Sequence, residues 1–203
     1  MKEKIMQTVF TIGHSTHTTE EFLALLERHA VTAVCDVRSR PYSRFNPQFN
    51  RENLIKDLKT KHIAYVYLGR ELGPRSDDPD CYIDNRVQYD RIAGTQLFQK
   101  GLKRVKEGMK EYRIALMCAE KDPIVCHRTI LVCRHLRGSD VEIQHIREDG
   151  LLESNKDAEK RLMRLLKVPA ATLFESPEEL VEKAYDLQSR KIAYTADKDP
   201  EEA

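Results

Sequence analysis

The densest group of chemically reactive side chains lies between residues 118 and 128. It combines two thiols, a carboxylate, an imidazole and a guanidinium, from Cys118, Glu120, Cys126, His127 and Arg128. A thiol close to a helix N-terminus and to cationic side chains is expected to have a lowered pKa, which suits it to nucleophilic attack or to metal binding. Glu120 can act as a general base or a nucleophile. We therefore predict Cys118 and Glu120 as catalytic residues, and Cys126, His127 and Arg128 as substrate-binding residues.

The spacing of these cysteines excludes two kinds of site. A phosphatase or rhodanese loop requires a Cys-x5-Arg pattern, in which an arginine stands six positions after the cysteine. That position is Ile124 for Cys118 and Val132 for Cys126, so neither cysteine fits the pattern. A zinc ribbon requires Cys-x2-Cys pairs. Seven residues separate Cys118 from Cys126. The two thiols and a histidine can still meet in space, so a metal site stays open as an alternative, although we assign no metal ligand.

Packing is the competing explanation for every cysteine, because free cysteine is among the most buried residue types. We assign Cys133, on an apolar helical face, and also Cys35 and Cys81 to the core. Five cysteines, an odd number in a chain without an apparent export signal, argue against a disulfide framework.

A second polar segment spans residues 36–45. Asp36 follows an apolar run, where an acidic residue commonly orients a base, a metal or a hydroxyl group. Three arginines fall within seven residues, with two aromatic residues between and after them: Arg38, Arg40, Arg44, Tyr42 and Phe45. Such a set can hold phosphate and stack a base. We predict Asp36 as catalytic and Arg38 and Arg44 as substrate-binding, against the alternative of a surface arginine loop.

A third polar segment is Gly13-His14-Ser15. Gly13 allows the backbone to approach a ligand, and the helix that follows favours an anion at its N-terminus. His14 can act as an acid, a base or a ligand. We predict His14 as catalytic and Ser15 as substrate-binding, the alternative being a simple turn. Glu71 is expected at the rim of the same site, together with Arg44.

The rest of the chain alternates between two periodicities, which is typical of a parallel sheet covered on both faces. Short apolar runs predict strands at residues 9–12, 32–37, 63–68, 113–118 and 141–146. Helix signals lie at Thr18, at Asn50, along residues 89–105, from Asp122-Pro123 to Arg137, at residues 155–166 and from Ser176. We predict a single α/β domain of about five mostly parallel strands over residues 1–168, then a C-terminal helical extension and polar tail over residues 169–203. In such a sheet, ligands bind at the carboxyl ends of the strands, where the three polar segments begin.

Composition sets limits on partners and location. The 203 residues are 40% hydrophobic and 33% charged, with a net charge of +1, so no global field attracts nucleic acid or a membrane. Apolar stretches fall short of the roughly 20 residues of a spanning helix. The N-terminal residues resemble no signal peptide, so we expect a cytoplasmic protein without membrane contact.

These segments resemble an uncharacterised prokaryotic family, the domain of unknown function 488. The resemblance covers about residues 9–166 and is carried by residues 11–15, residues 36–38 with Pro41 and Arg44, residues 67–73, and residues 118–123 with Cys126, His127 and Arg128. It implies a compact α/β fold and a shared polar site, and it brings no established substrate or cofactor.

Three functional hypotheses follow. The first is an enzyme that acts on a phosphate-bearing, nucleotide-like substrate at the carboxyl edge of the sheet. The second is a module that binds nucleic acid or a nucleotide signal without catalysis, and the third is a metal or redox regulator that uses Cys118 and Cys126. Residue patterns of ordinary ATPases, dehydrogenases and esterases are missing from the sequence. The cofactor and the oligomeric state are left open.

Overall fold

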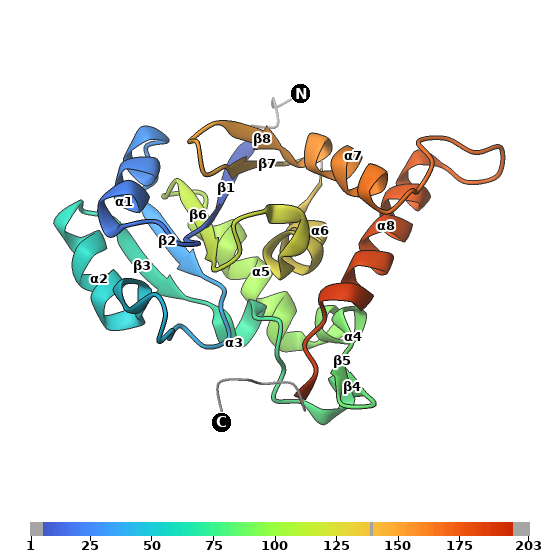
Figure 1. The fold of residues 1–203 in the computed structure, drawn as a ribbon, viewed down its shortest axis with the longest axis horizontal. Coiled ribbons are helices and arrows are strands. Elements are labelled where there is room, and N and C mark those ends of the chain that lie inside the picture. The colour runs from blue at the N-terminus through green and yellow to red at the C-terminus, as the bar shows by residue number, and fades with distance from the viewer. Residues whose placement is uncertain (1–5, 139, 197–203) are drawn as a thin grey trace.

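The centre of the molecule is a six-stranded sheet with the order β3-β2-β6-β1-β7-β8. A computed structural model describes residues 6–138 and 140–196 of the chain (Figure 1). Five strands are parallel and β8 is antiparallel to β7. The strands are β1 (Gln7–Gly13), β2 (Ala33–Asp36), β3 (Ala64–Tyr67), β6 (Ile114–Cys118), β7 (Val141–Ile146) and β8 (Leu152–Ser154). The predicted α/β fold with about five mostly parallel strands is confirmed, and β8 extends it at one edge.

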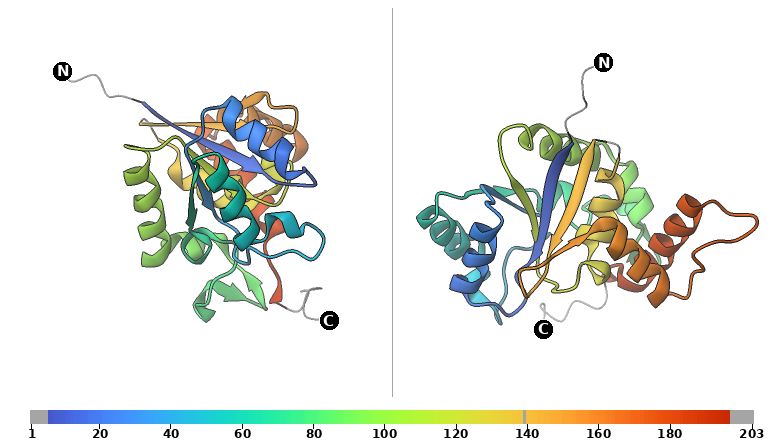
Figure 2. Two further views of the ribbon diagram at one scale, coloured as in Figure 1. Left: turned by 90° about the vertical axis from the view of Figure 1, so that its left-hand side faces the viewer. Right: turned by 90° about the horizontal axis from the view of Figure 1, so that it is seen from above.

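Helices cover both faces of this sheet (Figure 2). The α-helices are α1 (Thr19–Arg28), α2 (Arg51–Thr60), α3 (Gly69–Leu72), α4 (Tyr89–Gly94), α5 (Gln96–Gly108), α6 (Arg134–Leu136), α7 (Asn155–Leu165) and α8 (Pro177–Ile192). Shorter turns of helix are η1 (Pro47–Phe49), η2 (Pro79–Cys81), η3 (Pro123–Val125) and the π-helix η4 (Arg128–Cys133). A small hairpin of β4 (Tyr82–Ile83) and β5 (Arg86–Val87) lies within the loop between α3 and α4.

Two hydrophobic cores lie on the two faces of the sheet, and β6 contributes to both. Its five residues are all buried and alternate between the faces. Leu116 and Cys118 join the core under α5, η4 and α8, whereas Ala115 and Met117 join the core under α1 and α2. A strand buried on both faces reads as an unbroken apolar run, which is why the sequence identifies it.

The chain leaves neighbouring strands toward opposite faces of the sheet. The helices that follow β1 and β2 pack in one core, and the segment that follows β6 packs in the other. Because β6 lies between β1 and β2, the loops after these three strands open a crevice at the carboxyl edge. This divergence brings the three polar segments of the sequence to one place.

One predicted helix is wrong. The sequence indicates a continuous helix from Asp122-Pro123 to Arg137, but the structure has a single turn at η3, an extended Cys126 (φ −121°, ψ 140°), and then η4 and α6. Asp122 does cap the first turn, since its side chain accepts a hydrogen bond from the Ile124 N–H. A capping signal fixes a start but not a length, and the tertiary contacts of Arg128 interrupt the continuation.

The C-terminal helix α8 is joined to the main body. Leu180, Ala184 and Tyr185 are fully buried in the core that lies under α5 and η4. The side-chain amide of Gln188 donates a hydrogen bond to the carbonyl oxygen of Ile124. Residues 197–203 of the expected polar tail lie outside the described residues, as do residues 1–5. Across the part of the chain described here, we find no helix with the length and apolar character needed to span a membrane.

A buried polar chain links β1, β7 and α7. The Thr11 hydroxyl lies 2.8 Å from Nδ1 of His145, its neighbour in register, and Nε2 of His145 lies 3.2 Å from the amide oxygen of Asn155. Because an amide oxygen only accepts, Nε2 carries the proton and Nδ1 accepts from Thr11. Burial, with a smaller contribution from the charge of Arg128, lowers the pKa of His145 to about 3.

We therefore expect acid to destabilise the fold through His145. The pKa of His145 is 6.5 in the unfolded chain and about 3 in the folded one. Between pH 6.5 and pH 3, His145 is therefore protonated in the unfolded chain and neutral in the folded chain. The contribution is intact above pH 6.5 and is lost toward pH 3, with a slope of about 1.4 kcal/mol per pH unit. Urea titrations of wild type and His145→Gln across this window measure it. Parallel stability curves for the two proteins would contradict this assignment.

Candidate functional site

The site is built on a buried ion pair at the end of β2. Asp36 is fully buried, and its carboxylate accepts hydrogen bonds from Nε and Nη2 of Arg38 at 2.9 and 2.7 Å. It also accepts from the backbone N–H of Arg38 at 3.1 Å and from the Tyr65 hydroxyl at 2.9 Å. Burial opposes the charge of Arg38, but Asp36 holds the pKa of this guanidinium above its ordinary value. The pair fixes Arg38 in one orientation.

His14, at the end of β1, takes its protonation state from Arg38. Nη1 of Arg38 lies 3.2 Å from Nε2 of His14, and since a guanidinium only donates, Nε2 carries the lone pair. Nδ1 then carries the proton and donates to the Ser15 carbonyl oxygen at 3.0 Å. Burial, followed by the charge of Arg38, lowers the pKa of His14 to about 4. The imidazole also stacks on Phe49, with ring centroids 4.4 Å apart. His14 is therefore a neutral acceptor for Arg38.

Glycines allow the backbone around Arg38 to pack closely. A Cβ atom on Gly69, at the start of α3, would lie 1.9 Å from the carbonyl oxygen of Arg38. One on Gly73 would lie 2.3 Å from the hydroxyl oxygen of Ser39. Likewise, a Cβ on Gly13 would lie 1.9 Å from the carbonyl oxygen of Glu120. Glycine is required at these three positions because the Cβ atom of any other residue would collide with the neighbouring backbone or side-chain atom.

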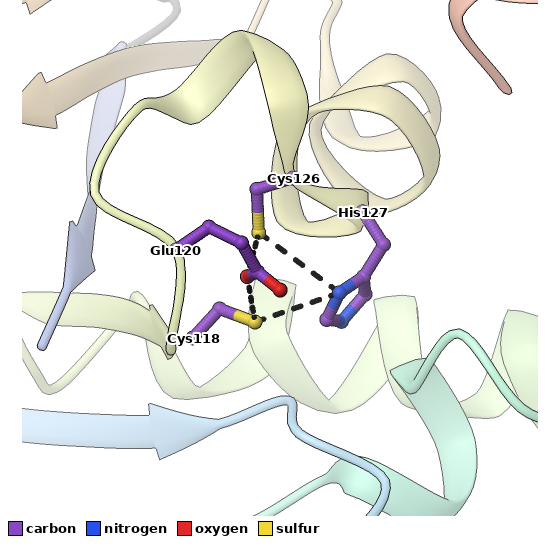
Figure 3. Close-up of side chains that lie close together, drawn as sticks. All are labelled: Cys118, Glu120, Cys126 and His127. Carbon is purple, nitrogen blue, oxygen red and sulfur yellow. Dashed lines mark hydrogen bonds between the residues drawn. The ribbon is translucent and has the colours of Figure 1, made fainter. Parts of the chain in front are cut away.

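Four potential metal ligands converge at the end of β6 (Figure 3). One ligand atom from each of Cys118, Glu120, Cys126 and His127 lies within 4.8 Å of the others. Both thiols donate to the same carboxylate oxygen of Glu120, each at 2.9 Å. Nδ1 of His127 lies 3.5 Å from the sulfur of Cys118 and 3.9 Å from that of Cys126. On the other side of the ring, Nε2 of His127 donates to the Val37 carbonyl oxygen at 3.0 Å. Sequence analysis left this cluster open and assigned no metal ligand.

The electrostatics of this cluster differ from expectation in one respect. The sequence predicts a thiol with a lowered pKa, but burial raises the pKa of Cys126 well above its ordinary value. Cys126 precedes the helical segment and is closed off from solvent, so the favourable effect of a helix N-terminus is lost. Burial also opposes ionisation of Glu120, yet His127 and the hydrogen bonds from both thiols hold its pKa at about 2. Burial raises the pKa of Cys133 as well, in agreement with its assignment to the core.

Arg128 lies behind the cluster and is fully buried. Its Nη1 and Nη2 atoms donate to the carbonyl oxygens of Glu120 and Lys121 at 2.5 and 3.1 Å, and its Nε donates to the Thr11 hydroxyl at 3.4 Å. Its backbone N–H lies 3.4 Å from the sulfur of Cys126. The guanidinium is thus occupied in holding the loop after β6 against the following segment.

In front of the cluster lies a cavity of about 340 Å³. Charged, sulfur-containing and aromatic side chains share its wall. The lining consists of His14, Arg38, Ser39, Arg40, Tyr42, Ser43, Asn46, Pro74, Arg75, Cys118, Ala119, Glu120 and His127. Tyr42 is 60% exposed, so its ring is accessible at this wall.

The structure separates the predicted site residues into two groups. His14, Arg38, Cys118, Glu120 and His127 line the cavity. The others lie outside its lining. Asp36, Cys126 and Arg128 are buried, and Ser15 lies in a turn with a φ of 46°. Arg44 is exposed, and Glu71 forms an ion pair with Arg104 of α5.

Sequence reasoning missed several lining residues, among them Asn46 and Arg75. Both come from irregular segments, where no periodicity indicates which way a side chain points. The Asn50 side chain, expected to cap α2, instead accepts a hydrogen bond from the Ser43 N–H at 2.7 Å and so holds the arginine-rich loop in place.

Comparison with known proteins gave one match. A family model described as "Domain of unknown function DUF488" matches residues 18–134, a range that includes the loops after β2 and β6 but not the Gly13-His14-Ser15 turn. Searches of curated proteins and of solved structures found no match.

The buried ion pair gives a stability prediction. Asp36→Asn leaves the guanidinium of Arg38 buried without its counter-ion and should lower the free energy of unfolding by about 3–5 kcal/mol. Tyr65→Phe removes one of several donors to the same carboxylate and should cost about 1 kcal/mol. Denaturant unfolding measures both. Equal losses, or a loss under about 1 kcal/mol for Asp36→Asn, would show that the pair does not organise this edge of the sheet.

Proposed function

We propose that this chain, which belongs to the family described as domain of unknown function DUF488, is an enzyme that acts on a small phosphate-bearing, nucleotide-like substrate. The observation that carries the proposal is the composition of the cavity wall. Three arginines, Arg38, Arg40 and Arg75, line one cavity together with Glu120 and Cys118.

The arginines suit an anionic substrate. Arg38 donates from Nε and Nη2 to Asp36, from Nη2 also to the Phe49 carbonyl oxygen, and from Nη1 to His14. These bonds leave the second hydrogen of Nη1 for a ligand, and Arg38 lines the cavity. Arg40 and Arg75 add positive charge to the same wall. Guanidinium groups bind phosphate oxygens through charge-assisted hydrogen bonds.

The size and the aromatic wall suit a mononucleotide. Ligand pockets usually measure about 300–1,000 Å³, and this cavity of about 340 Å³ falls at the lower end. The accessible ring of Tyr42 offers a surface on which a base can stack. A concave cavity and a net charge of +1 fit a small ligand better than a long duplex.

Glu120 is the strongest candidate for the chemistry. Its pKa of about 2 keeps it ionised at neutral pH, and it lies on the cavity wall. Asp36 and His14, in contrast, both hydrogen bond to Arg38, and their remaining polar atoms bond to the Tyr65 hydroxyl and to the Ser15 carbonyl oxygen. We therefore assign Asp36 and His14 to positioning Arg38.

We expect the loss of cavity arginines to weaken anion binding. Arg40→Ala and Arg75→Ala should each cost about 1.5–3 kcal/mol in binding phosphate or a mononucleotide, the range for a hydrogen bond to a charged group. Arg44→Ala is the matched control, because Arg44 lies in the same loop, is exposed and lies outside the lining. Calorimetry with inorganic phosphate and mononucleotides measures these affinities. The anion site is refuted if Arg44→Ala binds phosphate and mononucleotides as weakly as the two cavity variants do, or if wild type binds none of these ligands.

Turnover separates an enzyme from a binding module. Wild type should convert one member of a panel of nucleotides and phosphate esters, detected by mass spectrometry of the products. Glu120→Gln, which removes the charge at constant size, should reduce the rate by at least the factor of about 100 typical of acid–base groups. Binding of nucleotides without any conversion would favour the non-catalytic alternative, a nucleotide-signal module.

A further inference from the structure

We infer that Cys118, Cys126 and His127 bind one zinc ion at the back of the cavity, with Glu120 as an exchangeable fourth ligand. The metal site stands on the geometry of these four side chains. Its part in catalysis rests on the proposed function.

The separations between the ligand atoms fit a tetrahedral metal. Zinc binds sulfur at about 2.3 Å and nitrogen or oxygen at about 2.0–2.2 Å, so its ligand atoms lie roughly 3.3–3.8 Å from one another. The two sulfur-to-nitrogen distances in the cluster are 3.5 and 3.9 Å. The sulfur-to-oxygen distances of 2.9 Å are those of hydrogen bonds, which open slightly when a metal replaces the proton.

The orientation of His127 is already that of a metal ligand. Its Nε2 atom donates to the Val37 carbonyl oxygen, and its Nδ1 atom faces both sulfurs. Zinc-bound histidines usually donate their second ring nitrogen to a carbonyl or carboxylate in this way, which fixes the ring before the metal arrives. A histidine that only fills space in a core has no need to face two thiols.

Charge balance permits the metal without adding buried charge. Arg128 is a fully buried cation that donates to two carbonyls and a hydroxyl, and the ionised Glu120 beside it already balances its charge. Zinc with two thiolates, a carboxylate and a neutral imidazole carries a net charge of −1. Its neighbour Arg128, whose backbone N–H also points at the sulfur of Cys126, brings the total to zero. Buried charge is tolerated when it is balanced in this way.

The donor set points to zinc and to a site open to ligand. Thiolate and imidazole donors select zinc over magnesium or calcium. Structural zinc sites are closed by sulfur and nitrogen, whereas catalytic sites have three protein ligands and an exchangeable position. Here Glu120, unlike the other three residues, is exposed as a whole residue, and it lies on the cavity wall with Cys118 and His127. Zinc held by Cys118, Cys126 and His127 would supply a Lewis acid to the cavity, and Glu120 would be the ligand able to give up its place to substrate or water.

Metal analysis of the full-length chain tests the inference. Protein purified without chelators and dialysed against a slight excess of zinc should contain about one zinc per chain by elemental mass spectrometry, the stoichiometry of a single tetrahedral site. After replacement by cobalt, the visible spectrum should show tetrahedral bands and a sulfur-to-cobalt charge-transfer band of the intensity for two thiolates.

Variants of the ligands locate the metal. Cys118→Ser, Cys126→Ser and His127→Gln should each weaken zinc binding by more than the roughly 10- to 100-fold that outer-shell changes cost. Cys133→Ala is the matched control, because Cys133 is equally buried and lies outside the cluster. Circular dichroism checks that each variant folds. If a ligand variant does not fold, the sulfur-to-cobalt band of the wild-type protein tests instead whether two thiolates bind the metal.

The outcomes separate the metal site from the proposed function. Stoichiometric zinc with a two-thiolate spectrum supports the site even if the cavity binds no phosphate or nucleotide. Absence of zinc and of the charge-transfer band, a Cys118–Cys126 disulfide as the stable form, or equal loss in Cys133→Ala overturns the inference, even if nucleotides bind and are converted.

Discussion

The arrangement of the candidate site depends on the buried side chain of Arg128. By donating to the carbonyl oxygens of residues 120 and 121, it folds the loop after β6 back over the end of that strand. This contact brings Cys126 and His127 against Cys118, which would otherwise end a strand with no partner. The cost of burying a guanidinium is offset by several hydrogen bonds and by the anionic cluster beside it. The interrupted helix at residues 123–137 follows from the same contact.

Arg38 organises the opposite side of the cavity in a different way. Arg128 is directed inward and holds backbone, whereas Arg38 is held by Asp36 and presents one edge to the cavity. Both are arginines in short polar segments next to a strand, and residue type alone does not distinguish them. The difference comes from the neighbours: Arg38 has a carboxylate two residues before it, and Arg128 has carbonyl groups that approach only after the loop has folded.

Much of the fold could be predicted from the sequence, because five apolar strand-like runs alternate with capped helices. The meeting of the three polar segments at one cavity could be predicted as well, since parallel strands present their carboxyl ends at one edge. The thiol chemistry could not. The pKa of Cys126 depends on burial, which the sequence does not report, and proximity to His127 suggested the opposite direction. The positions of Arg75 and Asn46 in the cavity wall could not be predicted either, because both residues come from irregular loops. The orientation of the His127 ring depends on the carbonyl oxygen of Val37, ninety residues away in the sequence.

The contact between Gln188 and Ile124 has a consequence for the order of events during synthesis. Ile124 belongs to the turn just before Cys126 and is buried, and its carbonyl oxygen receives a hydrogen bond from α8, which is synthesised after every strand of the sheet. Until α8 emerges from the ribosome, that turn lacks both its cover and its hydrogen bond. The nascent chain can therefore pair its parallel strands before α8 is made, while the segment that carries two of the four clustered side chains gains its buried hydrogen bond only once α8 has packed. Closure of the site is in this sense coupled to the synthesis of α8.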